Sequence, residues 1–174
     1  TDEAAVERAI ESASGAFGRI DVLVNNAAID ITVPIDELAV GDWNRVLATN
    51  LGAPFMMTRA ALPELRRNSG YVVNIASTAS CRAWPNASAY HATKWGLLGL
   101  SRALHAELRP QGVKVTATAI YSKTQGFLAI ASGVDYLAPY YNRMQSIDIN
   151  TRETLEALAG FIKRFDAPSK IMAA

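Results

Sequence analysis

Cysteine and histidine are scarce in this sequence. Its 174 residues contain one cysteine, Cys81, so no disulfide can form within the chain, and we expect a reducing compartment and a cytoplasmic location. The two histidines, His91 and His105, lie 14 residues apart, with no Cys, Asp or Glu at a metal-binding spacing. We therefore expect no metal site and interpret both histidines as packing or surface residues.

A charge excess and a long apolar run are missing as well. The chain has 17 Lys and Arg against 16 Asp and Glu, a formal net charge of +1, and no basic tract. This balance predicts neither nucleic acid nor a membrane surface as a partner. No apolar run approaches the roughly 20 residues that cross a bilayer, and no signal peptide is recognisable. The ordinary hydrophobic content and the length predict one soluble domain over residues 1–174.

Strands and helices alternate along the chain. Short apolar runs at residues 20–24, 71–76 and 113–120 are typical of parallel strands that are covered on both faces. Apolar residues at helical spacing predict helices over 1–17, 42–67, 87–109 and 150–164, and a last strand begins near residue 170. This order favours an α/β fold built on a parallel sheet.

Chemically useful side chains gather between the second strand and the helix that follows it. Ser77 comes directly after the strand, and Tyr90 lies thirteen residues further on, in the first turns of the helix. Lys94, four residues after Tyr90, shares its helix face. Tyrosine is a poor acid or base at neutral pH, but a nearby ammonium favours its phenolate. A serine hydroxyl alongside could hold a carbonyl oxygen while the tyrosine gives or takes a proton.

Asn50 lies within the helix predicted over 42–67, four residues before Pro54. Proline has no N–H, so the Asn50 carbonyl loses its helical partner and the helix should kink there. A freed carbonyl that faces a site can hold a water molecule. The alternative is that Asn50 is a polar residue beside a kink, without a further role.

A second asparagine-rich stretch, Asn25-Asn26-Ala27-Ala28, follows the first predicted strand. Taken alone it can be a turn that closes a strand, because asparagine suits turns. Together with Asn50, Ser77 and the Tyr-x-x-x-Lys pattern at Tyr90, however, it resembles the short-chain dehydrogenase/reductase family of the classical type. Ala28 stands where that family usually has glycine, and the resemblance covers residues 1 to about 120 well.

The resemblance implies an oxidoreductase that moves a hydride between NAD or NADP and a small-molecule carbonyl or alcohol. It implies Tyr90 as general acid/base and Lys94 as the residue that favours the phenolate and binds the nicotinamide ribose. Ser77 would hold the substrate oxygen, and the Asn50 backbone would anchor a water in the proton relay. The asparagines that follow the first strand would tie neighbouring strands together, and Asn25 and Ala27 would lie at the cofactor's adenosine side. The choice between NAD and NADP, and the substrate, stay open.

The fold that the resemblance implies is a Rossmann-like doubly wound parallel sheet with three αβα layers. Members of the family often form dimers or tetramers through two long helices, here those predicted over 42–67 and 87–109. Residues 121–149 correspond to the variable lid over the substrate, although Tyr121-Ser122-Lys123-Thr124 lacks the family's Pro-Gly pair. Alternatively, residues 127–144 are a helix that packs its aromatic side chains on the core.

A glycine-rich turn of the G-x-G-x-x-G kind, which cradles a dinucleotide's phosphates, is absent from the 174 residues. We therefore expect an N-terminally truncated fold that binds NAD(P) weakly or not at all on its own, shows no dehydrogenase activity alone, and self-associates through the apolar strand at 20–24. The alternative from another class is a non-catalytic Rossmann-like remnant or oligomerisation module that binds no cofactor.

Overall fold

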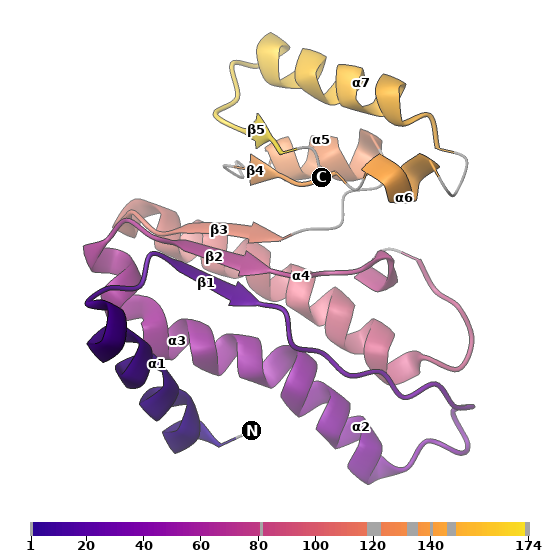
Figure 1. Ribbon diagram of the computed structural model, residues 1–174. Coiled ribbons are helices and arrows are strands. Elements are labelled where there is room, and N and C mark those ends of the chain that lie inside the picture. Colours follow the sequence, from indigo (N-terminus) through magenta and orange to yellow (C-terminus); the bar gives the residue numbers. More distant parts are fainter. Residues whose placement is uncertain are drawn as a thin grey trace.

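The computed structural model describes residues 2–80, 82–117, 123–131, 136–139, 141–145 and 149–172. Three parallel strands form its larger sheet in the order β1-β2-β3: β1 (Val22–Asn25), β2 (Tyr71–Asn74) and β3 (Lys114–Ala117) (Figure 1). The three predicted strands are therefore confirmed: the first runs over 22–25 where 20–24 was expected, the second ends at 74 and the third begins at 114, with residues 118–120 outside the described residues. Parallel pairing follows from the helices between the strands, because such a connection returns the chain to the same end of the sheet.

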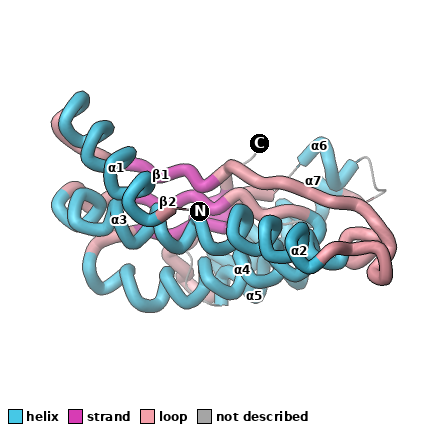
Figure 2. Tube along the Cα trace, turned by 90° about the horizontal axis from the view of Figure 1, so that it is seen from below, coloured by secondary structure: helices cyan, strands magenta, loops and turns pink. Residues whose placement is uncertain are grey.

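Helices connect and cover these strands. They are α1 (Glu3–Phe17), α2 (Val40–Leu47), α3 (Ala53–Arg67) and α4 (Ser88–Leu108), with a π-helical turn, η1 (Ala48–Gly52), between α2 and α3. In Figure 2, α2 and α3 follow one another as a nearly continuous rod beside the strands. A π turn lies just before Pro54, where the sequence predicted a kink, and such turns often accompany functional sites.

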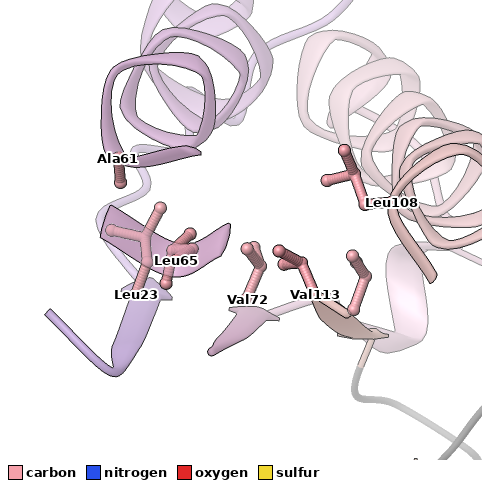
Figure 3. Close-up of a cluster of buried hydrophobic side chains, with 7 residues drawn as sticks. Leu23, Ala61, Leu65, Val72, Leu108 and Val113 are labelled. Atoms are coloured by element: carbon pink, nitrogen blue, oxygen red, sulfur yellow. The ribbon is translucent and has the colours of Figure 1, made fainter. Parts of the chain in front are cut away.

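The core of this unit lies between the sheet and α3 and α4. Figure 3 shows Leu23, Val72 and Val113 of the sheet region pointing toward Ala61 and Leu65 of α3 and Leu108 of α4, and all of these side chains are buried. A sheet packed in this way against crossover helices is the α/β arrangement of the Rossmann fold. The predicted fold class is therefore confirmed.

The opposite face of β1 is less covered. Val22 and Val24, which alternate with buried Leu23, are 50% and 55% exposed. Among the described strands β1 pairs with β2, at the edge of the sheet. An apolar strand with a free edge is a template for pairing with another chain.

Replacing Val24 with lysine is expected to reduce self-association of the 174-residue chain, because a charge on an edge strand opposes further pairing. The solution mass, measured by light scattering over a range of concentrations, should fall toward that of the monomer. Ile35→Lys, at an exposed apolar residue of the loop between β1 and α2, is the matched control and should leave the mass unchanged. Equal masses for wild type and Val24→Lys would rule out pairing through β1.

The C-terminal residues form a second, smaller sheet. Its two parallel strands, β4 (Tyr136–Leu137) and β5 (Lys170–Ile171), pack with α5 (Lys123–Ala131), α6 (Tyr141–Gln145) and α7 (Thr151–Arg164). The helix expected over 150–164 and the strand near 170 are confirmed, and Asn150 caps α7 by accepting a hydrogen bond from Glu153 N at 3.1 Å.

This second unit has its own apolar cluster, centred on Ile130, Leu137 and Leu158. α5 and α7 pack closely there, since a Cβ at Gly126 would lie 2.2 Å from the Leu158 side chain. Tyr136 reaches the larger sheet, where its ring lies 5.9 Å from that of Tyr71. The single domain and the lid over 121–149 stay predictions; residues 121–122, 132–135, 140 and 146–148 of that lid lie outside the described residues.

Candidate active site

Ser77 and Tyr90 flank one segment at the C-terminal end of β2. Ser77 immediately precedes the short 3₁₀ turn η2 (Thr78–Ser80), and Tyr90 lies in the first turn of α4. The chain returns from η2 to α4 within a few residues, so both residues are positioned by the end of one strand and the start of one helix. Ligands of open α/β sheets bind at this carboxyl end of the strands.

Lys94 joins these parts. It is 3% exposed, and its ammonium donates a hydrogen bond of 2.7 Å to the carbonyl oxygen of Ile75, two residues before Ser77. The same ammonium lies 5.5 Å from the centre of the Tyr90 ring. Burial lowers the pKa of Lys94 below its usual 10.5, because the charged form loses hydration. The structure therefore brings Lys94 to Tyr90 and to the strand end that carries Ser77.

The Ser77 hydroxyl is held by the turn that follows it. Its oxygen accepts a hydrogen bond of 3.2 Å from Ala79 N, and Ser80 N donates to the Ser77 carbonyl at 2.9 Å. Ser80 Oγ in turn donates to the carbonyl oxygen of Lys94 at 2.9 Å. Since a hydroxyl both donates and accepts, the Ser77 proton stays free to be donated to another oxygen.

Asn50 is buried in η1 and faces the loop after β1. Its side-chain nitrogen donates to Ile29 O at 2.8 Å, and its side-chain oxygen accepts from Ile29 N at 2.8 Å. The nitrogen also donates to Thr93 Oγ1 at 3.2 Å, and that hydroxyl donates to Tyr90 O at 2.8 Å. Asn50 is therefore linked through Thr93 to the backbone of Tyr90, and its side chain fixes the loop that carries Ala27.

Replacing Asn50 with alanine is expected to lower the free energy of unfolding by about 2 kcal/mol, because the Ile29 N–H and C=O both lose a partly buried partner. Urea denaturation followed by circular dichroism measures the change. Asn44→Ala, at an exposed asparagine of α2, is the control and should cost less than about 0.5 kcal/mol. A change at Asn50 as small as that of the control would contradict the anchoring role.

The side chain of Asn25 links β1 to β2. Its side chain donates to Asn74 Oδ1 at 2.8 Å, and Asn74 Nδ2 donates to Ser101 Oγ on α4 at 2.8 Å. The side chain of Asn25 is thus directed at its neighbouring strand. Ala27 and Ala28, two and three residues further on, are exposed, so the backbone there is open to a ligand.

The sequence interpretation missed several residues of this network. Thr93, Asn74 and Ser80 had no predicted role, and all three are buried polar residues that hold the site together. A polar residue that ends an apolar strand, as Asn74 does, is a signal that could have been used, because buried polar groups need partners. His91, which the sequence predicts to be a packing or surface residue, forms two hydrogen bonds: one with Ala79 O in η2 and one with Trp84 N in the loop that follows.

Within the described ranges, no cluster of three or more His, Cys, Asp or Glu side chains could hold a metal ion. No helix among these residues is long and apolar enough to cross a membrane.

The exposed Ala27 backbone and the Lys94 ammonium, both at the carboxyl end of the sheet, fit a nicotinamide dinucleotide, which needs hydrogen-bond donors and an open backbone.

Comparison with known proteins relates most of the chain to one family. The family model described as short chain dehydrogenase matches residues 1–125. The D-threitol dehydrogenase of Mycolicibacterium smegmatis is 40% identical over 115 residues, which cover 66% of this chain and 44% of that protein. The 2-dehydro-3-deoxy-L-rhamnonate dehydrogenase (NAD(+)) of a Sphingomonas species is 39% identical over 119 residues, which cover 67% of this chain and 48% of that protein. The chain spans about half the length of these two curated dehydrogenases.

Solved structures agree with this relationship. The 3-ketoacyl-(acyl-carrier-protein) reductase of Brucella melitensis, solved with NADH, matches with a TM-score of 0.65 and 32% identity, over 67% of this chain and 51% of that one. The carveol dehydrogenase of Mycobacterium avium, solved with NAD, gives a TM-score of 0.65 at 27% identity, over 70% of this chain and 45% of that one.

The C-terminal part has a different similarity. A model described as Transaldolase/Fructose-6-phosphate aldolase matches residues 101–172, which overlaps the first match over 101–125. A probable fructose-6-phosphate aldolase of Streptococcus pneumoniae is 52% identical over 73 residues, 42% of this chain and 32% of that protein. Residues 126–172, which hold the second sheet, therefore resemble a portion of an aldolase.

Proposed function

Since the chain belongs to the short-chain dehydrogenase family, we propose that it provides the acid–base part of an NAD(P)-dependent oxidoreductase acting on small carbonyl or alcohol compounds. One observation carries the proposal. The Lys94 ammonium lies 2.7 Å from Ile75 O and 5.5 Å from the Tyr90 ring, which gathers a cation, a phenol and the Ser77 segment at one strand end. A proton can be moved where these three groups meet.

In this proposal Tyr90 is the residue that gives a proton to the substrate oxygen during reduction and removes it during oxidation. The Lys94 ammonium lies 5.5 Å from the centre of the Tyr90 ring and places a positive charge beside the residue that transfers the proton. Ser77 donates its free proton to the same substrate oxygen and holds it in place. Asn50 keeps the Tyr90 turn in position through Thr93, and its backbone anchors a relay water.

The cofactor would be held by Asn25 and Ala27 on the adenosine side and by Tyr90 and Lys94 on the nicotinamide side. A bound nicotinamide supplies or accepts the hydride at the substrate carbon. NADH, NAD and NADP each occur in solved relatives, which supports either dinucleotide. We also propose that the protein works in the cytoplasm, as the scarcity of cysteine suggests.

Saturation-transfer NMR with NADH tests this proposal, because the method detects the weak binding expected of a chain without a glycine-rich turn. The nicotinamide ring and its ribose should give the strongest signals. Lys94→Met should reduce them at least severalfold, whereas Lys163→Met, at an exposed lysine of α7, should not. Signals from the adenine alone, or equal signals in the two variants, would contradict the assignment of Lys94.

The relatives' names suggest which substrates to examine. They act on D-threitol, 2-dehydro-3-deoxy-L-rhamnonate and D-β-hydroxybutyrate, which are small hydroxylated compounds. Polyols and hydroxy acids of this size, assayed with NAD and NADP by absorbance at the reduced nicotinamide band, therefore form the first panel.

We propose a homodimer or homotetramer formed through the long helices. Phe55 on α3 and Trp95 on α4 support this, since each is about half exposed, and large exposed aromatic residues are enriched at interfaces. Trp95→Glu should lower the solution mass measured by sedimentation, because a charge replaces an apolar anchor. Trp84→Glu, at an exposed tryptophan outside the two helices, is the control. An unchanged mass for Trp95→Glu would exclude α4 as the interface.

A further inference from the structure

His91, the residue after Tyr90, makes hydrogen bonds with both of its ring nitrogens. Trp84 N lies 3.2 Å from Nε2, and Ala79 O lies 3.1 Å from Nδ1. A backbone N–H can only donate, so Nε2 accepts, and Nδ1 carries the proton that is donated to Ala79 O. The Trp84 ring also packs edge-on against the imidazole, with ring centres 4.1 Å apart. The two partners thus require one neutral tautomer.

The peptide groups of Ala79 connect this histidine to Ser77. Ala79 is fully buried, and its carbonyl accepts the proton of His91 Nδ1. Its N–H donates to Ser77 Oγ at 3.2 Å. Ala79 therefore bonds to the Ser77 hydroxyl through its N–H and to the His91 imidazole through its carbonyl. Because a buried carbonyl needs a partner, loss of the imidazole would favour a different orientation of η2.

A second contact fixes the same turn to the same helix. Ser80 Oγ donates to Lys94 O, so η2 is held by α4 at His91 and again at Lys94. Resting on the function proposed above, we propose that His91 is a positioning residue, which sets the direction of the Ser77 hydroxyl through Ala79. It is not a catalytic residue, because its ring contacts Ala79 and Trp84 and not a reacting group.

Two substitutions separate the two hydrogen bonds of the imidazole. In His91→Asn the amide nitrogen takes the place of Nδ1 and can still donate to Ala79 O. In His91→Gln the longer side chain places its amide oxygen near Nε2, where it can still accept from Trp84 N. His91→Ala removes both bonds. If His91 acts through Ala79, asparagine should substitute for it and glutamine should not.

Amide hydrogen exchange of Ala79, measured by NMR on the full chain, reports the bond to Ser77 without any need for turnover. We expect exchange to be about tenfold faster in His91→Ala and His91→Gln, because one hydrogen bond is lost, and within about twofold of wild type in His91→Asn.

Tryptic cleavage after exposed Arg82 should show the reverse order, slow in His91→Gln and fast in His91→Asn, because the bond from Trp84 N to the residue at position 91 holds that loop. Thermal melting confirms that each variant is folded.

The turnover of the same variants completes the test. In a preparation that turns over substrate, kcat should fall about tenfold in His91→Ala with KM nearly unchanged, and His91→Asn should restore it. Equal Ala79 exchange in His91→Asn and His91→Gln, or wild-type exchange in His91→Ala, would overturn the positioning role. Saturation-transfer signals from the adenine of NADH alone, with the exchange pattern intact, would instead count against the proposed function and leave the link from His91 to Ser77 standing.

Discussion

Tyr90→Phe should lower NAD(P)-dependent turnover by about 10²–10⁴-fold while the protein stays folded, because general acid–base catalysis typically contributes that much. The substitution removes one hydroxyl and keeps the ring that lies 5.5 Å from the Lys94 ammonium, so packing around it is preserved. Initial rates in a preparation that turns over substrate, together with a thermal melt, measure the two effects separately.

A matched control is available for Tyr90. Tyr141→Phe removes a tyrosine hydroxyl from the exposed start of α6, and its rate should equal that of wild type. Turnover of Tyr90→Phe within about threefold of wild type would remove Tyr90 from the mechanism, since no missing proton donor leaves a rate so little changed.

Lys94→Met should separate activity from stability. Removing a charge placed beside a reacting group costs about 10²–10³ in turnover. The free energy of unfolding at pH 7 should change by less than about 1 kcal/mol, because relief from burying an ammonium offsets the lost hydrogen bond to Ile75 O. Lys163→Met should leave both quantities unchanged. A large loss of stability in Lys94→Met would show that the ammonium serves the fold.

The pH dependence of stability gives Lys94 a second signature. Burial lowers its pKa below 10.5 in the folded chain, so between that lowered pKa and 10.5 the unfolded chain binds more protons than the folded one. Stability must therefore rise with pH in this window. Urea denaturation of wild type from pH 7 to 10.5 should show this rise relative to Lys94→Met, and parallel curves for the two proteins would contradict it.

The sequence was sufficient for the elements of the first unit and for the neighbourhood of Tyr90 and Lys94. Apolar runs reveal buried strands, and a spacing of four places two side chains on one helix face whatever surrounds them. The identity of Asn74 as the partner of Asn25 could not be predicted in this way, although the resemblance implied that Asn25 ties neighbouring strands together. It depends on the register of two strands that are about 49 residues apart in the chain, and no local pattern specifies that register.

The role of His91 escaped the sequence interpretation for a similar reason. Helical periodicity indicates the face on which a histidine lies and not the loop atoms that bond to it. The second sheet shows the same limit on a larger scale. Only the strand near residue 170 was predicted, whereas β4 lies in the stretch interpreted as a lid or as a helix over 127–144, so the sequence pattern alone did not reveal that β4 and β5 pair or that this region resembles an aldolase.

The π turn at Asn50 determines how the rod of α2 and α3 is phased against the sheet. Val46, Asn50, Pro54 and Thr58 are all buried, each four residues after the one before. In a regular α-helix a step of four residues overshoots a full turn by about 40°, so three steps would rotate Thr58 about 120° away from Val46. The wider ring of η1 absorbs roughly one residue of that rotation. Deleting a single residue from 48–52 would therefore leave a regular helix in which Val46 and Thr58 are eleven residues apart and only about 20° out of phase, so the buried face of the rod would be kept while the wide turn that holds Asn50 would be lost.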